Sequence, residues 1–112
     1  PYLAAFEKCR GRLETATVTV LAKSSSDSNE VGAASYSYME LMGLVLYCFM
    51  WQRILAAALA DQNSESSDAD YTDALVKTGG FFLQRLLPRT ESLLAEISSG
   101  AESLMTMRAE QF

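Results

Sequence analysis

The chain has 112 residues, 49% of them hydrophobic and 21% charged, a length and composition typical of one globular domain. Its net charge of −5, without a cluster of lysines or arginines, predicts no nucleic-acid partner because nothing is arranged to neutralise phosphates. The absence of histidine excludes His-containing catalytic triads and the commonest metal ligand. No secretory signal opens the sequence, and a first residue of proline indicates either a removed initiator methionine or a piece of a longer protein.

The segment before residue 24 has the apolar spacing of one helix face. The β-branched run at 17–20, TVTV, also suits a strand, but no second strand signal occurs in the sequence and an isolated strand is not stable. We therefore predict a helix, followed by a polar linker at 24–30. The apolar stripe, in steps of three or four residues, comprises Leu3, Phe6, Cys9, Leu13, Ala16 and Val20.

A long second helix is predicted over about residues 31–61, running antiparallel to the first because the linker is short. This arrangement places Cys48 within roughly one helical turn of Cys9. The two cysteines have no metal-binding or redox spacing, so two interpretations stay open: buried free thiols in a reducing compartment, or a disulfide between them. The first agrees with a cytoplasmic protein, which we expect here.

A third helix is predicted to begin near Ser67 or Asp68, where SDAD supplies a cap and acidic first-turn residues. Asp73 and Lys77 form an i,i+4 ion pair in the favourable order. Pro88 ends or kinks this helix because it lacks an N–H donor and clashes with the preceding turn. The predicted apolar face comprises Tyr71, Ala74, Leu75, Thr78, Phe81, Phe82 and Leu86.

A fourth helical stretch follows Pro88, and its apolar residues are Leu93, Leu94, Ile97, Leu104 and Met105. Ser99 and Glu102 have the spacing of a capping box, which predicts that the helix restarts around Gly100. The sequence thus predicts an all-α fold: an antiparallel four-helix bundle-like single domain over 1–112, with a long apolar central helix at about 31–61 and a break at Pro88.

The segment at 38–60, YMELMGLVLYCFMWQRILAAALA, is the most apolar part of the chain. A membrane span needs about 20 mostly apolar residues. The run without a charged or strongly polar residue, Leu41 to Trp51, has only eleven. Because Arg53 would lie inside a longer span at a high cost, we predict no membrane span and assign the segment to the centre of a helical core.

We predict no catalytic, cofactor-binding or metal-binding residue in this chain. Glu40 lacks the partner at i,i+3 that bundle-core metal sites use, and TGGFF at 78–82 lacks the strand that precedes a phosphate-binding loop. We expect Glu40 to pair instead with Lys77 or Arg85.

The central helix is apolar nearly all round, so three amphipathic helices cannot cover it completely. We expect the remainder to form an exposed apolar patch, which usually marks a protein–protein contact. Gly43 and the alanines at 56–58 and 60 would let another helix approach closely.

Two segments, 38–60 and 77–105, carry an ordered set of motifs, in which RLLP at 85–88 lies about a dozen residues before SGAESL at 99–104. This set resembles the extra C-terminal helical domain of one subgroup of acyl-CoA dehydrogenases. The resemblance covers most of the chain and is weakest in the first helix. The matching positions are Tyr38, Gly43, Trp51 and the alanines after it, Lys77, Phe82, Arg85, Leu86, Leu87, Pro88, Gly100, Ser103, Leu104 and Met105.

The resemblance implies a parent flavoprotein of fatty acid metabolism that oxidises acyl-CoA thioesters with bound FAD and a catalytic Glu. In that subgroup the flavin site and the Glu base lie in earlier domains, and no residue of this chain matches them. The chain is then the non-catalytic C-terminal part of a longer oxidoreductase, with no cofactor of its own. Its implied partners are the preceding catalytic domains of the same polypeptide and further copies in a homo-oligomer such as a dimer.

The residues expected at packing or interface positions are Tyr38, Gly43, Trp51, Phe82, Arg85 and Pro88. Two alternatives stay open from the residues alone. One is a free-standing helical-bundle module that binds a partner helix or a small apolar ligand. The other is a small membrane-associated protein.

Overall fold

The computed structural model describes residues 1–65 and 68–112, and within these ranges the chain is helical with no strand. The predicted all-α class, the long apolar second helix and the break before the fourth helix are confirmed. The elements are α1 (Tyr2–Ser24), α2 (Asn29–Ala60), η1 (Asp61–Asn63), α3 (Ala69–Phe81), η2 (Phe82–Leu86), α4 (Arg89–Ser98), α5 (Glu102–Met105) and η3 (Ala109–Gln111).

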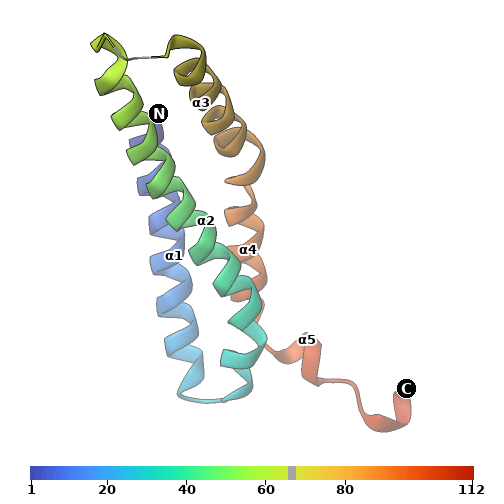
Figure 1. Cartoon of the computed structure of the whole chain (residues 1–112). Coiled ribbons are helices and arrows are strands. Elements are labelled where there is room, and N and C mark those ends of the chain that lie inside the picture. The colour runs from blue at the N-terminus through green and yellow to red at the C-terminus, as the bar shows by residue number, and fades with distance from the viewer. Residues whose placement is uncertain (66–67) are drawn as a thin grey trace.

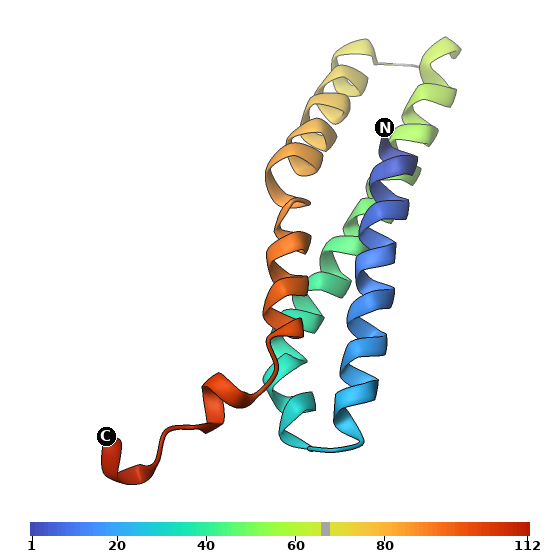
Figure 2. The same cartoon turned by 180° about the vertical axis from the view of Figure 1, so that it is seen from behind.

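The helices form an elongated antiparallel assembly (Figure 1). α1 and α2 make a hairpin, while α3, η2 and α4 follow one another back along α2, so that α4 contacts both helices of the hairpin. Beyond α4 the chain leaves the bundle, as both views show (Figure 2). The radius of gyration is 19.0 Å, against about 13 Å for a compact domain of this length. The elongated shape and the projecting C-terminal segment account for this larger radius.

The turn between α1 and α2 is short and polar, as predicted. The backbone N–H of Asn29 donates to the Asp27 carboxylate (2.9 Å), and that of Asp27 donates to the Lys23 carbonyl (3.2 Å). The TVTV run is helical as predicted, and the hydroxyls of Thr17 and Thr19 donate to carbonyls four residues earlier, each at 2.8 Å.

The core lies where α1, α2, η2 and α4 meet. On α1 the predicted stripe is largely confirmed, since Cys9 and Ala16 are buried and three more of its residues pack partly against the core. Leu3 is the exception and is exposed. The buried cluster comprises Cys9, Ala16, Ala34, Leu41, Leu44, Val45, Cys48, Phe82, Leu87, Leu93 and Ile97.

The start of α3 is set by Asp68, whose carboxylate accepts from the backbone N–H groups of Asp70 (3.0 Å) and Tyr71 (3.1 Å). This confirms Asp68 as the cap, while Ser67 lies outside the described residues. The predicted Asp73–Lys77 ion pair is also present, at 2.6 Å.

The predicted apolar face of α3 is only partly confirmed, since Phe82 is buried and Leu75 is half-buried. Tyr71, Phe81 and Leu86 are exposed, whereas Gly79 and Leu87 are buried. Leu87 rather than Leu86 is buried because of η2, a π-helical turn in which the N–H of Leu87 donates to the Phe82 carbonyl five residues earlier (3.0 Å). The extra residue in this turn rotates the following face by about 100° relative to a regular helix. Pro88 follows directly, so the bend occurs at the predicted place.

The restart after α4 also differs from the prediction. Ser99 does not cap the next helix; its hydroxyl donates to the Glu96 carbonyl (2.6 Å), and α5 follows Ala101 without a side-chain cap. The reason is Gly100, whose φ of +78° turns the chain sharply between the two helices. Leu93 and Ile97 are buried as expected, whereas the predicted apolar residues beyond the turn, Leu104 and Met105, are exposed.

Candidate interaction surface

The side of α2 that faces away from the bundle is a continuous apolar surface, as expected from the sequence. Its residues recur every three or four positions, so they lie on one helix face, and all are exposed large hydrophobic side chains. We call this set the outer face of α2: Met39, Met42, Leu46, Tyr47, Met50 and Ile54. Leu46 is 56% exposed, whereas Leu41 on the opposite side of the same helix is 0% exposed.

Small residues and a single cation complete this face. A Cβ added to Gly43 would meet no atom within 4 Å, so there is open space above the helix at this point. The guanidinium of Arg53 lies 5.7 Å from the centroid of the Phe49 ring, and Phe49 in turn contacts Phe6 of α1 with a ring separation of 5.7 Å. The outer face therefore presents an apolar surface with the charged Arg53 near its end, beside Ile54.

Glu40 borders the outer face but does not pair with Lys77 or Arg85, so that prediction is wrong. Its carboxylate accepts from Arg89 (3.1 Å) and from the Tyr36 hydroxyl (3.1 Å). The antiparallel path brings the start of α4, rather than α3, beside the first half of α2. Lys77 is instead held by Asp73 within α3.

The six residues expected at interface positions do not share one surface. Phe82 is buried and Trp51 half-buried in the core, where both help to pack the helices together. Tyr38 is half-buried, and its hydroxyl is 2.8 Å from the Thr17 hydroxyl. The other three, Gly43, Arg85 and Pro88, are accessible but lie on different elements.

Polar contacts between α1 and α4 were not predicted from the sequence. The Arg12 guanidinium donates to the hydroxyl of Thr90 (2.7 Å) and to the carboxylate of Glu91 (2.6 Å). Thr90 is fully buried, and its own hydroxyl donates to the Leu87 carbonyl (2.8 Å). Ser37 makes a similar link from α2 to the Glu96 carboxylate of α4 (2.7 Å). The partners lie 59 to 79 residues apart in the sequence, so no local sequence pattern predicts these contacts.

The two cysteines face each other inside the core as free thiols. Burial raises the pKa of Cys9, and burial together with the neighbouring Cys9 raises the pKa of Cys48 to about 12. Both thiols are therefore protonated near neutral pH, which makes them weak nucleophiles. Among the described residues, no group of three or more acidic or cysteine side chains is placed to hold a metal ion.

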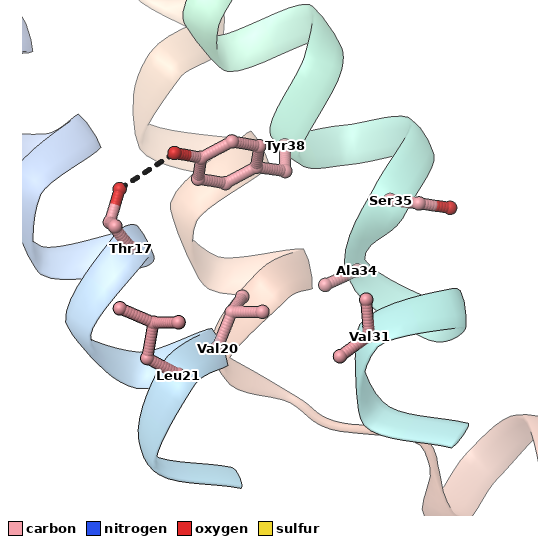
Figure 3. Close-up of a pocket in the computed structure, with 7 residues that line it drawn as sticks. All are labelled: Thr17, Val20, Leu21, Val31, Ala34, Ser35 and Tyr38. Atoms are coloured by element: carbon pink, nitrogen blue, oxygen red, sulfur yellow. Dashed lines mark hydrogen bonds between the residues drawn. The ribbon is translucent and has the colours of Figure 1, made fainter. Parts of the chain in front are cut away.

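An apolar hollow of about 350 Å³ lies between the end of α1 and the start of α2 (Figure 3). Val20 and Leu21 line one side, and Val31 and Ala34 the other. The hydrogen bond between the Tyr38 and Thr17 hydroxyls lies at its upper end.

A protein-family model, described as acetyl-CoA dehydrogenase C-terminal like, matches residues 1–108. The chain belongs to this family. The match includes α1, where the resemblance seen in the sequence was weakest, and it agrees with the expected C-terminal domain of acyl-CoA dehydrogenases. Comparison with curated proteins and with solved structures found no match.

By length and composition alone, the helix over Asn29–Asn63 is apolar enough to cross a membrane, with a mean hydropathy of 1.5. The core helix of a soluble bundle has the same properties, and α1, α3 and α4 all pack against this helix. The absence of a membrane span therefore stays a prediction.

Proposed function

We propose that this chain is the non-catalytic C-terminal helical domain of an FAD-dependent acyl-CoA dehydrogenase, and that the outer face of α2 packs against the preceding catalytic domains of the same polypeptide. The flavin, the acyl-CoA substrate and the catalytic Glu base then belong to those domains. The parent enzyme is a cytoplasmic homo-oligomer whose assembly this domain supports. Membership of the acetyl-CoA dehydrogenase C-terminal-like family supports this proposal.

The observation that carries the proposal is the exposure of the outer face. Fully burying one Leu or Met side chain stabilises a protein by about 1.5–3 kcal/mol, and six large apolar side chains are left uncovered on one face of α2. A neighbouring domain on the same polypeptide meets this face at a high effective concentration, so the contact needs little additional affinity. The small side chain of Gly43 lets such a neighbour approach the helix closely.

The titratable groups of the chain support a non-catalytic role. The Glu40 carboxylate is engaged by Arg89 and Tyr36, and the two thiols are buried and protonated. A protonated, buried thiol is not poised as a general base near neutral pH.

The test is Leu46→Glu in the parent enzyme, with Tyr71→Glu as the matched control, because Tyr71 is similarly exposed but lies on α3. We expect Leu46→Glu to lower the thermal unfolding temperature of the parent and its bound flavin, measured by flavin absorbance, while the control changes neither. If both variants behave like the unmodified enzyme, the outer face does not contact the catalytic domains.

A second arm of the test uses the chain by itself, mixed with FAD and an acyl-CoA. We expect no flavin binding in equilibrium dialysis and no turnover. Flavin retention or dehydrogenation by residues 1–112 alone would contradict a non-catalytic role.

A further inference from the structure

Residues 102–112 form a segment that leaves the bundle, which we call the C-terminal arm. It contains α5 and η3, and it leads away from the helices in both views (Figures 1 and 2). Every residue of the arm is exposed, including the apolar side chains of Leu104, Met105 and Met107. Three large apolar side chains within four positions on a projecting segment need a surface to cover them.

The direction of the arm is set at its base. Gly100 has the left-handed φ of +78°, and the backbone N–H of Ala101 donates to the Glu30 carboxylate (3.1 Å). The Lys23 ammonium donates to the Ser98 carbonyl (2.8 Å). These contacts tie the base of the arm to the α1–α2 turn, so the arm starts from a fixed point at that end of the bundle.

The apolar hollow between α1 and α2 opens at this same end, because Leu21 and Val31 of its lining lie next to the turn (Figure 3). A second hollow of about 430 Å³ continues it along α1 and shares Thr17 and Tyr38 with it. We call the two together the α1–α2 groove. The hydroxyls of Thr17 and Tyr38 bond to each other where the two hollows meet, and the Ser35 hydroxyl donates to the Gly32 carbonyl (2.8 Å), so these three hydroxyls already have partners when an apolar occupant binds.

We propose that the α1–α2 groove binds the C-terminal arm of a second copy of this chain, and that two copies exchange arms reciprocally. From the turn, the groove offers first apolar side chains, then Glu14 and then Arg10. The arm offers, in the same direction, the apolar residues 104–107, then Arg108 and then Glu110. Apolar side chains thus meet the apolar part of the groove, and each charge of the arm meets its opposite. Glu14 and Arg10 form an ion pair with each other at 3.2 Å, and Arg10 also pairs with Glu7 at 2.8 Å. These side chains are half or more exposed, and such surface pairs contribute little to stability, so the charges of the arm can replace them as partners.

The position of the groove favours the arm of a second copy over the chain's own arm. The arm continues from α4, whereas the groove lies on the side of the α1–α2 pair away from α4 (Figure 3). The chain's own arm would have to reverse direction around the hairpin after Gly100. A second copy placed end to end needs no reversal.

Because the base of the arm and the mouth of the groove lie at one end of the bundle, a two-fold axis there makes both contacts equivalent. From Ala101 to Met107, six residues reach at most about 20 Å, enough to enter a neighbouring groove.

The experiment is a cysteine crosslink in the full chain, with Leu104→Cys on the arm and Val31→Cys at the mouth of the groove, oxidised by copper phenanthroline. The native Cys9 and Cys48 are buried and do not compete. The controls are Leu104→Cys alone and Leu104→Cys with Leu59→Cys, since Leu59 is exposed at the other end of α2. On a denaturing gel we expect at least tenfold more crosslinked dimer from the arm–groove pair than from either control.

An internally crosslinked monomer would assign the groove to the chain's own arm and overturn the proposal, as would the absence of any crosslink above the controls.

A second measurement is the molar mass of the chain truncated after Ala101, by sedimentation. Because the arm is exposed throughout, truncation is expected to preserve the helical circular dichroism. The proposal requires truncation to convert dimer to monomer. A dimer that survives truncation forms through another surface, such as the outer face of α2, and overturns arm exchange without touching the proposed function.

Discussion

The two faces of α2 are both apolar, yet one is core and the other is surface. The inner face uses Leu41, Leu44 and Cys48, which pack against α1 and α4. The outer face carries three methionines among its six residues, and methionine is flexible and adapts to irregular partners. Hydrophobicity therefore does not separate core from surface in this helix. What separates them is the presence of a neighbouring helix, and the outer face is suited to a partner that arrives from outside the chain.

The sharpest test of this comparison is Leu41→Ala against Leu46→Ala in the isolated chain. Leu41 is fully buried, so its truncation is expected to lower the free energy of unfolding by about 2–5 kcal/mol. Leu46→Ala should change it by less than about 0.5 kcal/mol, because that side chain is on the surface. Urea denaturation measures both. A large loss from Leu46→Ala would mean that copies of the chain already cover the outer face.

Gly79 of α3 packs against the C-terminal half of α2, beside Trp51 and Leu55. A Cβ at this position would lie 2.5 Å from the Tyr2 hydroxyl oxygen, 3.1 Å from Leu55 and 3.2 Å from Trp51. We expect Gly79→Ala to destabilise the chain by about 1–3 kcal/mol through overpacking. Gly80→Ala is the matched control, since a Cβ there meets nothing within 4 Å, and it should stabilise α3 by about 0.5–1 kcal/mol. Thermal melts that rank the two variants in the opposite order would show that α3 does not pack on α2 in this way.

Cys48 makes the stability of the inner face depend on alkaline pH. Its pKa rises from 9.0 to about 12 on burial, so the folded chain keeps a proton that the unfolded chain releases. This contribution is complete below pH 9 and is lost as the pH rises from 9 toward 12. We expect Cys48 alone to lower the unfolding free energy by about 1.4 kcal/mol between pH 8 and pH 10.

Urea unfolding at the two pH values measures this loss. Cys48→Ala should be less stable at pH 8 but should show a smaller loss between the two pH values. An unchanged loss in Cys48→Ala would assign the pH dependence to other groups.

The smallest effect is expected at the border between the two faces, where Glu40 pairs with Arg89. The Arg89 side chain is 55% exposed, so solvent screens the pair. We expect a coupling of about 0.2–1 kcal/mol from the cycle of Glu40→Gln, Arg89→Gln and the double variant, and less at high salt. A coupling energy above this range would mean that the Glu40–Arg89 pair is shielded from solvent, contrary to its exposure in this structure.

Local patterns predicted the features that depend on neighbours along the chain. The Asp68 cap, the Asp73–Lys77 pair and the helical TVTV run each involve groups within four residues of one another. The bend at Pro88 is equally local, because a proline lacks the donor that continues a helix. The prediction of an uncovered apolar face on α2 is also confirmed, because it depends only on how many helices are available to cover α2.

The candidate surface itself was predicted only in part. Gly43 lies on the outer face of α2, whereas Trp51 and Phe82 pack in the core. A match to family motifs does not tell whether a residue packs in the core or contacts a partner at the surface. The exposed arm was expected to be an ordinary fourth helix. The capping-box spacing of Ser99 and Glu102 gave no sign that Gly100 would intervene in a left-handed conformation.

The sequence by itself determined the helices, their order, the short antiparallel turn and the place of the bend, because hydrogen bonds and clashes within a few residues decide them. Only the tertiary structure decided which side of α2 and of α3 is buried. One π-helical turn at Phe82–Leu86 rotates everything after it, and the partners of Arg12, Ser37 and Glu40 lie tens of residues away. These outcomes depend on how three packed helices fit together, and no local spacing contains that information.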